Sequence, residues 1–253
     1  VGHAAGNAIT TGTNNTLIGS SAGDALTDAD LNVAVGFGSL GFDQLGSKTT
    51  AIGYRALGTQ RFTTATNSYN TAVGANAGTA VTTGIKNTII GGLAGDALTA
   101  GQENTVVGKS ALSADTLGSH STAVGIGTLS AQNFTTATDT HNTAVGAYAG
   151  EAVTTGIENT ILGSAAGDAL TVGSYNVALG SFALSADTAG SQNVAVGRGA
   201  LLSQNFTTAT NSLNTAVGMH AGNAVTTGIE NTIIGGLAGD ALTDADYNVA
   251  VGA

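Results

Sequence analysis

The most regular feature of this chain is a short pattern of polar and apolar residues that ends in glycine and recurs fifteen times. Around Gly74 the pattern reads Asn70-Thr71-Ala72-Val73-Gly74, with two apolar residues directly before the glycine. The closing glycines are 17, 17, 17 and then 21 residues apart, so that four copies make a period of 72 residues. A fixed period of this length predicts a repeat protein in which each copy forms one coil of a solenoid.

Each copy of the pattern predicts a β-strand that ends at a tight corner. The residue before the closing glycine is always aliphatic, and the residue before that one is also apolar. Neighbouring residues of a strand point to opposite faces, so both faces of this strand are apolar, as is typical of parallel sheets. After the glycine, Ala77 and the pair Ala80-Val81 predict a second short strand, and Thr82-Thr83-Gly84 predicts a polar turn.

These elements predict an all-β fold, a parallel β-solenoid or β-roll rod of 17/17/17/21-residue coils. We expect a single repeat domain over residues 1–253, divided into the units 2–73, 74–145, 146–217 and 218–253. Neither end reads as a polar cap, so we expect a segment of a longer fibre. A coil this thin encloses one row of aliphatic side chains and leaves its second apolar face uncovered. We therefore expect self-association, as a parallel homotrimer or a longer fibre.

Asparagine lies four residues before the closing glycine in most coils, as at Asn70, and Thr49 and Ser121 replace it in two. Asparagine tolerates a left-handed backbone and hydrogen-bonds to neighbouring peptide groups. Stacked from coil to coil, these residues predict a ladder of side chains at a turn. The alternative is a row of amides that binds a ligand.

The Asn70–Gly74 and Thr82–Gly84 elements resemble repeats of trimeric fibrous adhesins, the β-roll heads of autotransporter adhesins, and repeats of phage and bacterial tail-fibre-like proteins. The resemblance covers the whole chain and implies a trimeric fibre that is extracellular, on a cell surface or on a virion. The chain departs from the adhesin heads in its longer coils and in its 72-residue period.

Composition narrows the possible partners. The formal net charge is −10 and only 9% of residues are charged, whereas nucleic-acid binding requires clustered Lys and Arg. No apolar run approaches the roughly 20 residues of a membrane-spanning helix. The chain has no cysteine, which removes disulfides and thiolate metal sites. We expect no nucleic acid, no membrane span in this segment and no cofactor.

The coil that is four residues longer carries the sequence Phe-Thr-Thr-Ala-Thr once in each complete unit. These inserts could contact a partner or a glycan, or the phenylalanine could fold back over the end of the core. Asn133 and Asn205 also begin N-glycosylation patterns. The candidate loop, partner or glycan residues are Phe62, Thr63, Thr64, Asn133, Phe134, Thr135, Asn205, Phe206 and Thr207.

Two acidic turns resemble the start of a calcium-binding loop. Their candidate ligands are Asp28, Asp30 and Asn32, and Asp244, Asp246 and Asn248. The middle units lack these carboxylates, so a solvated polar turn is the simpler interpretation. The four histidines are interpreted as occupying unrelated coil positions without a paired acid. With no carboxylate pair confined to one site either, we expect no enzyme.

The sequence therefore predicts a structural or adhesive fibre, a rod that displays repeated Thr-rich loops and can meet a cell-surface or glycan receptor. The alternative is an ice-binding or surface-lattice β-solenoid, which requires a flat face with regular threonine rows. Thr71 and its counterparts form such a row, interrupted by valines such as Val33. Because these threonines share a side with the invariant aliphatic residue, we expect them to face inward.

Overall fold

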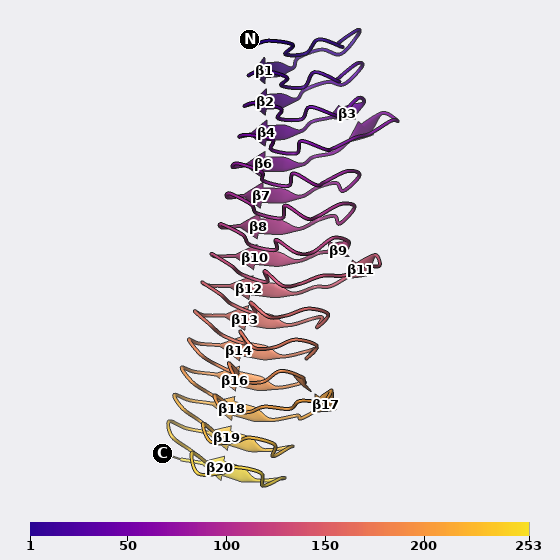
Figure 1. Ribbon diagram of the computed structural model, residues 1–253. Coiled ribbons are helices and arrows are strands. Elements are labelled where there is room, and N and C mark those ends of the chain that lie inside the picture. The colour runs from indigo at the N-terminus through magenta and orange to yellow at the C-terminus, as the bar shows by residue number, and fades with distance from the viewer. Residues whose placement is uncertain (253) are drawn as a thin grey trace. The chain divides into compact units, whose positions relative to one another are not determined.

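The computed structural model of the protein describes residues 1–252 and shows an all-β parallel β-solenoid of about 14 coils (Figure 1). No helix occurs in this described range. Contacts between residues divide the chain into two compact units, Val1–Ser121 with Asn133–Asp139, and Thr122–Gln132 with Thr140 onwards. This division does not follow the 72-residue period, and the single repeat domain expected from the sequence stays a prediction.

The first unit stacks its coils so that one three-residue strand of each coil joins a parallel sheet (Figure 1). The strands of this sheet are, in order, β1 (Thr16–Ile18), β2 (Val33–Val35), β4 (Thr50–Ile52), β6 (Thr71–Val73), β7 (Thr88–Ile90) and β8 (Thr105–Val107). Two-residue strands form two smaller parallel pairs, β3 (Gly46–Ser47) with β5 (Thr66–Asn67), and β9 (Gly118–Ser119) with β11 (Thr138–Asp139).

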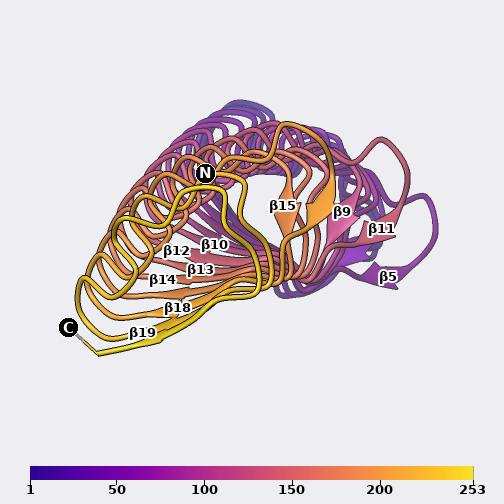
Figure 2. The same ribbon diagram turned by 90° about the horizontal axis from the view of Figure 1, so that it is seen from below.

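The second unit has the same construction. In Figure 2, its β13, β14, β18 and β19 lie along one wall, whereas β15 lies at another corner. Its main strands are, in order, β10 (Thr122–Val124), β12 (Thr143–Val145), β13 (Thr160–Leu162), β14 (Val177–Leu179), β16 (Val194–Val196), β18 (Thr215–Val217), β19 (Thr232–Ile234) and β20 (Val249–Val251). The small pair is β15 (Gly190–Ser191) with β17 (Thr210–Asn211).

The core lies under the middle residue of each main strand. Thr71, Ala72 and Val73 pair in register with the three residues of β7, and Ala72 and its partner Ile89 are fully buried. Because side chains alternate along a strand, the first and third residues point away from the core. The solenoid is therefore filled by one row of Ala, Ile, Val and Leu side chains from the sheet, as the thin coil predicts.

Two features require glycine at the closing position: its backbone φ angle and the close approach of the next coil. Gly74 has a φ of +140°, and a Cβ at this position would lie 2.5 Å from the carbonyl oxygen of Gly91 in the next coil. L-amino acids rarely adopt such a φ, and no real contact is this short. The invariance of this residue follows from how closely successive corners stack.

The second strand expected after each closing glycine is wrong for most coils, because this segment folds into successive tight turns. The N–H of Ala77 donates to the carbonyl of Gly74 at 3.3 Å, and the N–H of Val81 donates to that of Gly78 at 3.0 Å. Asn76 and Gly78 both have positive φ, near +57°, which turns the chain inward twice. Ala77 and Val81 are nonetheless fully buried, so the apolar character of these positions does reflect the core, although they do not lie in a strand.

The asparagine ladder is confirmed. Asn70 Oδ1 accepts from the N–H of Asn87 at 2.9 Å, and Asn87 Oδ1 accepts from the N–H of Asn104 at 3.0 Å. Asn87 Nδ2 also donates to the carbonyl of Gly101 at 2.9 Å. These asparagines are at most 1% exposed, so each amide satisfies buried backbone groups on both sides of a turn. Their role is structural, and the amide row is not open to a ligand.

Gly78 lies where the later coils of a unit carry a buried leucine such as Leu57. A Cβ at Gly78 would lie 3.1 Å from Leu57 Cδ2 and 2.9 Å from Ile89 Cδ1. The large side chains of neighbouring coils therefore fill the space that this glycine leaves. At this position each unit has glycine in two coils and leucine in the next two, and together they fill one continuous core shared by successive coils.

Within residues 1–252 there is no helix with the length and apolar character needed to cross a lipid bilayer.

Candidate functional site

The outward face of the main sheet is a regular surface in each of the two compact units. In the first unit, Ile52 and Ile90 end their strands with 37% and 38% of their surface exposed. In the second unit, the corresponding Leu162, Val217 and Ile234 are 46%, 37% and 42% exposed. These aliphatic side chains form a row on the outside of the solenoid, as expected for a strand that is apolar on both faces.

A threonine row accompanies this aliphatic row on the same outward face. Threonine opens ten of the fourteen main strands of the described chain, and valine opens the other four. None of the positions in these strands carries a charged residue. We call this surface, the first and third residues of the main strands, the outer sheet face.

The expectation that the threonines face inward is therefore wrong. Thr71 does share a side with Val73, but the inward residue of the strand is Ala72 between them. The interior is narrow, and a small middle residue lets the walls of the coil approach closely. The threonine hydroxyls and methyl groups are thus presented to the outside at each coil.

The phenylalanines of the long coil are buried, which confirms that they fold back over the end of the core. Phe62, Phe134 and Phe206 are 7%, 7% and 8% exposed. The residues that follow them at the loop tips are exposed, namely Thr63, Thr64, Thr135 and Thr207. The loops therefore offer hydroxyl groups, and not an aromatic surface, to a partner.

A buried Asp–Gln pair that sequence reasoning missed supports this loop. Asp43 Oδ1 accepts from the N–H groups of Phe62 at 2.9 Å and Gly46 at 3.2 Å. Its other oxygen accepts from Gln60 Nε2 at 2.6 Å, and Gln60 Oε1 accepts from Asn70 Nδ2 at 2.8 Å. The pair connects the insert to the asparagine ladder. Its signal in the sequence is an aspartate six residues before the asparagine position of the third coil, with glutamine two residues before each loop phenylalanine.

Asn133 and Asn205 lie at the exposed bases of their loops. The Oδ1 atom of each accepts from a threonine hydroxyl of the preceding coil, Thr116 and Thr188, at 3.3 Å. Glycosylation of these asparagines stays a prediction.

The first set of calcium candidates serves hydrogen bonds between coils. Asp28 Oδ1 accepts from the Thr11 hydroxyl at 2.5 Å, and Asp30 Oδ1 accepts from the backbone and hydroxyl of Thr13 at 2.6 and 2.9 Å. These bonds from Thr13 hold the pKa of Asp30 below its ordinary value. Asn32 is fully buried and belongs to the asparagine ladder. The structure therefore gives each of these side chains another role, and calcium binding stays a prediction.

The second set lies in the last coil and has similar contacts. Asp244 Oδ1 accepts from the hydroxyl of Thr243 at 3.0 Å, and Asp246 Oδ1 accepts from the N–H of Ile229 at 2.8 Å. Asn248 donates to Asn231 Oδ1 through its backbone N–H and through Nδ2, both at 2.9 Å. The bonds of Asp246 and Asn248 hold the acidic turn against the preceding coil, whereas that of Asp244 lies within the turn.

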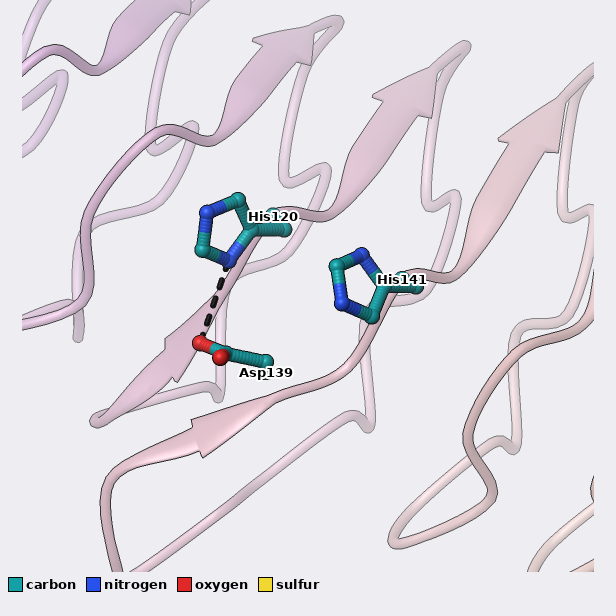
Figure 3. A group of neighbouring side chains, drawn as sticks. All are labelled: His120, Asp139 and His141. Atoms are coloured by element: carbon teal, nitrogen blue, oxygen red, sulfur yellow. Dashed lines mark hydrogen bonds and ion pairs between the residues drawn. The ribbon is translucent and has the colours of Figure 1, made fainter.

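A row of charged and polar side chains runs along the turn before the asparagine ladder. Lys86 Nζ lies 2.7 Å from Glu103 Oε1, and His120 Nε2 lies 3.3 Å from Glu103 Oε2. His120 Nδ1 lies 3.1 Å from Asp139 Oδ1. Figure 3 draws this interaction as a dashed line. Lys86 and then His120 lower the pKa of Glu103. All of these side chains are substantially exposed, so the ion pairs are screened by solvent and contribute little to stability.

Histidines in this row correct the interpretation that the four histidines occupy unrelated positions. His120 and His141 each lie five residues before a closing glycine, and Asp139 is two residues before His141. The three side chains drawn in Figure 3 are of types that ligate transition metals. Aligning the coils on their closing glycines would have revealed the shared position.

No protein-family model, curated protein or solved structure matches this chain.

Proposed function

We propose that this protein is a structural fibre protein, acting outside a cell or on a virion, whose solenoid associates with other copies of itself through the outer sheet face. The observation that carries the proposal is the row of half-exposed aliphatic side chains, such as Ile52, Ile90 and Leu162, on a surface that bears no charge. Large uncharged apolar surfaces on soluble proteins mark interaction sites.

Regular repetition makes this face suited to self-association. Each coil adds one aliphatic side chain at the strand spacing of about 4.8 Å, so a second copy can align with it over many coils. Burial of apolar surface contributes about 25 cal/mol per Å², and the contributions of successive coils add along the face. A closed ring of three copies would cover every outer face, in keeping with the resemblance to trimeric fibrous adhesins.

Adhesion is the second part of the proposal. The exposed loop tips, such as Thr63 and Thr64, recur once in each complete unit and in each copy of the chain. Weak contacts at several loops to a cell-surface or glycan receptor would add up through multivalency. The proposed role is thus a stiff scaffold that presents repeated, weakly binding loops.

Sedimentation equilibrium tests the self-association. We expect the chain to sediment at three times its own mass. Replacing Ile52 and Ile90 together by lysine should shift it to the monomer, because two charges per copy would be buried at the contact. Thr64→Lys adds a charge at an exposed loop tip and serves as the matched control, which should leave the mass unchanged. A folded wild-type monomer at high concentration would contradict the proposal.

Outward threonines also favour a second candidate, a solenoid that binds ice or another regular lattice. Thr71 and Thr88 repeat at the spacing of the sheet, and their hydroxyl and methyl groups both face outward. Such a face can hold water in a regular array. A gap between the freezing and melting temperatures of the solution would support this candidate, and the absence of that gap would exclude ice binding.

Both candidates use the outer sheet face, so they exclude each other. A trimer that covers the face leaves no threonine array to meet ice, whereas a monomer leaves it open. Sedimentation and the freezing assay on the same sample therefore decide between them.

A further inference from the structure

The 72-residue unit 2–73 carries a set of aromatic, basic and glycine residues that the next unit, 74–145, lacks at the same positions. Phe37, Gly41 and Phe42 follow Gly36 in its third coil, where the next unit has Lys109, Ser113 and Ala114. The fourth coil of the first unit also differs, with Tyr54, Arg55 and Gly58 in place of Ile126, Gly127 and Ser130. These substitutions lie on two adjacent coils, and most of the substituted residues line one hollow.

All of these residues except Tyr54 line a hollow of about 230 Å³. Its lining includes Phe37 and Phe42, together with the acidic Asp24 and the basic Arg55. Phe37 and Phe42 are 54% and 59% exposed, a large fraction for aromatic side chains. The volume is smaller than the roughly 300–1,000 Å³ of pockets for drug-sized ligands, which indicates a ligand of about one ring.

Glycines create the hollow. A Cβ at Gly41 would lie 3.3 Å from Asp24 Oδ1, so a serine here, as in the other units, would cover this carboxylate. A Cβ at Gly58 would lie 3.1 Å from the carbonyl oxygen of Arg55. Gly41 and Gly58 are themselves buried and form the floor beside the two phenylalanines.

The aromatic wall is braced from the side. The rings of Phe37 and Tyr54 are stacked, with centroids 5.7 Å apart and planes inclined by 12°. Offset stacking of this kind fixes the ring of Phe37 in place. Within residues 1–252, the Asp24 carboxylate and the Arg55 guanidinium have no hydrogen-bond or ion-pair partner, so both groups can bond to a ligand.

We propose that this hollow binds one neutral pyranose residue of a glycan. The C–H groups on one face of a pyranose ring pack against exposed aromatic rings, while its hydroxyl groups both donate and accept hydrogen bonds. Asp24 only accepts and Arg55 only donates, so together they match a polyol. Their opposite charges leave the hollow without a net charge, which favours a neutral sugar over a uronic or sialic acid. This proposal rests on the proposed adhesive function and names one site at which a glycan receptor would bind.

Ligand-observed NMR tests the site with methyl α-D-glucopyranoside, methyl β-D-galactopyranoside and methyl α-D-mannopyranoside as probes. We expect at least one to bind with a Kd near 1 mM or weaker, as is usual for a single small ring. Saturation should transfer mainly to the C–H protons on one ring face. Sodium D-glucuronate, a charged sugar of the same size, should bind less tightly.

The chain supplies its own matched control. The triple variant Gly41→Ser, Phe42→Ala and Gly58→Ser replaces each residue with its counterpart in the next unit, so it preserves side chains that these coil positions already accept. We expect at least a tenfold loss of sugar binding. Phe182→Ala removes an aromatic that is 45% exposed outside the hollow and should retain binding.

Three outcomes would overturn the proposal: no probe binds the wild-type chain at tens of millimolar, only glucuronate binds, or binding persists in the triple variant. Sedimentation of the triple variant separates this site from self-association. An unchanged mass with lost sugar binding supports the site whether the chain is a trimer or a monomer. A changed mass would mean that the hollow is filled by a second copy, which also overturns sugar binding.

Discussion

Replacing Asn87 with alanine tests whether the asparagine ladder holds the coils together. The substitution removes the hydrogen bond from Asn87 Nδ2 to the carbonyl of Gly101. It also removes the acceptor Oδ1, which binds the N–H of Asn104 at 3.0 Å and its Nδ2 at 3.2 Å. Asn87 is fully buried, so water does not reach these groups without local opening of the turn.

The expected cost follows from the two backbone groups that lose their partners. An unsatisfied buried donor or acceptor costs about 1–3 kcal/mol, so the Gly101 carbonyl and the Asn104 N–H together give about 2–6 kcal/mol. A water molecule entering the small space left by the amide would recover part of this. We therefore expect a loss of about 2–4 kcal/mol in the free energy of unfolding.

Urea denaturation followed by circular dichroism measures the loss, and amide hydrogen exchange locates it. Protection should fall first in the coils on either side of position 87, because each coil contacts only its neighbours. Thr88→Ala is the control, since its side chain lies on the outer sheet face of the same strand and should change stability by no more than about 0.5 kcal/mol. Equal stability of the two variants would refute the role of the ladder.

Three further tests address other parts of the solenoid. Gly91→Ala should lower the free energy of unfolding by about 3 kcal/mol or more, because its Cβ would lie 2.5 Å from a carbonyl oxygen of the next coil. Gly92→Ala is the control and should be tolerated, since no atom lies nearer than 3.9 Å to its Cβ. Thermal denaturation measures both. Burial raises the pKa of Asp96 and of Asp168, so stability falls as pH rises from the ordinary carboxyl range through their folded values. Changing both to asparagine should raise the melting temperature at pH 7 and not at pH 3; an equal gain at both would exclude ionisation as the cause. Phe134→Ala should cost about 3–5 kcal/mol and expose its loop to proteolysis, and an unchanged cleavage rate would contradict the loop's anchoring.

The sequence was sufficient to predict the solenoid, the main strand of each coil and the asparagine ladder. These features depend on strictly periodic residues whose local preference agrees with the fold. Each segment such as Asn70–Gly74 carries a ladder residue, a buried apolar residue and a corner that only glycine can form. Agreement between local and global preferences is what makes such a pattern readable from one chain.

Sequence reasoning failed where the direction of a side chain depends on the width of the coil. The apolar pair Ala72-Val73 shows that both faces are apolar and does not show which residue points inward. The interior accepts the small or branched middle residue, so Val73 and Thr71 face outward together. The segment around Ala77 failed for a related reason: its positive φ angles at Asn76 and Gly78 turn apolar residues inward without a strand.

The candidate sites were predicted only in part, because they depend on contacts between coils. The loop phenylalanines were found, but the buried support that Asp43 and Gln60 provide needs the register of residues 17 apart. The hollow beside Phe37 was missed because glycine looks like part of the repeat. The hollow can be found from the sequence only by aligning the 72-residue units, which shows that Gly41 stands where the other units have a serine.

The exposed positions that differ from coil to coil are the ones that can recognise a partner. The residue before each ladder asparagine has a positive φ, as in Lys86 at 58° and Glu103 at 57°, although glycine would adopt this backbone at lower cost. Side chains are nevertheless present there, are exposed and differ from coil to coil. Inward positions cannot vary in this way, since each contacts the coils on both sides. A solenoid of similar coils can therefore distinguish partners only through such outward positions, and Phe37 and Arg55, which the next unit replaces with lysine and glycine, line a hollow of this kind.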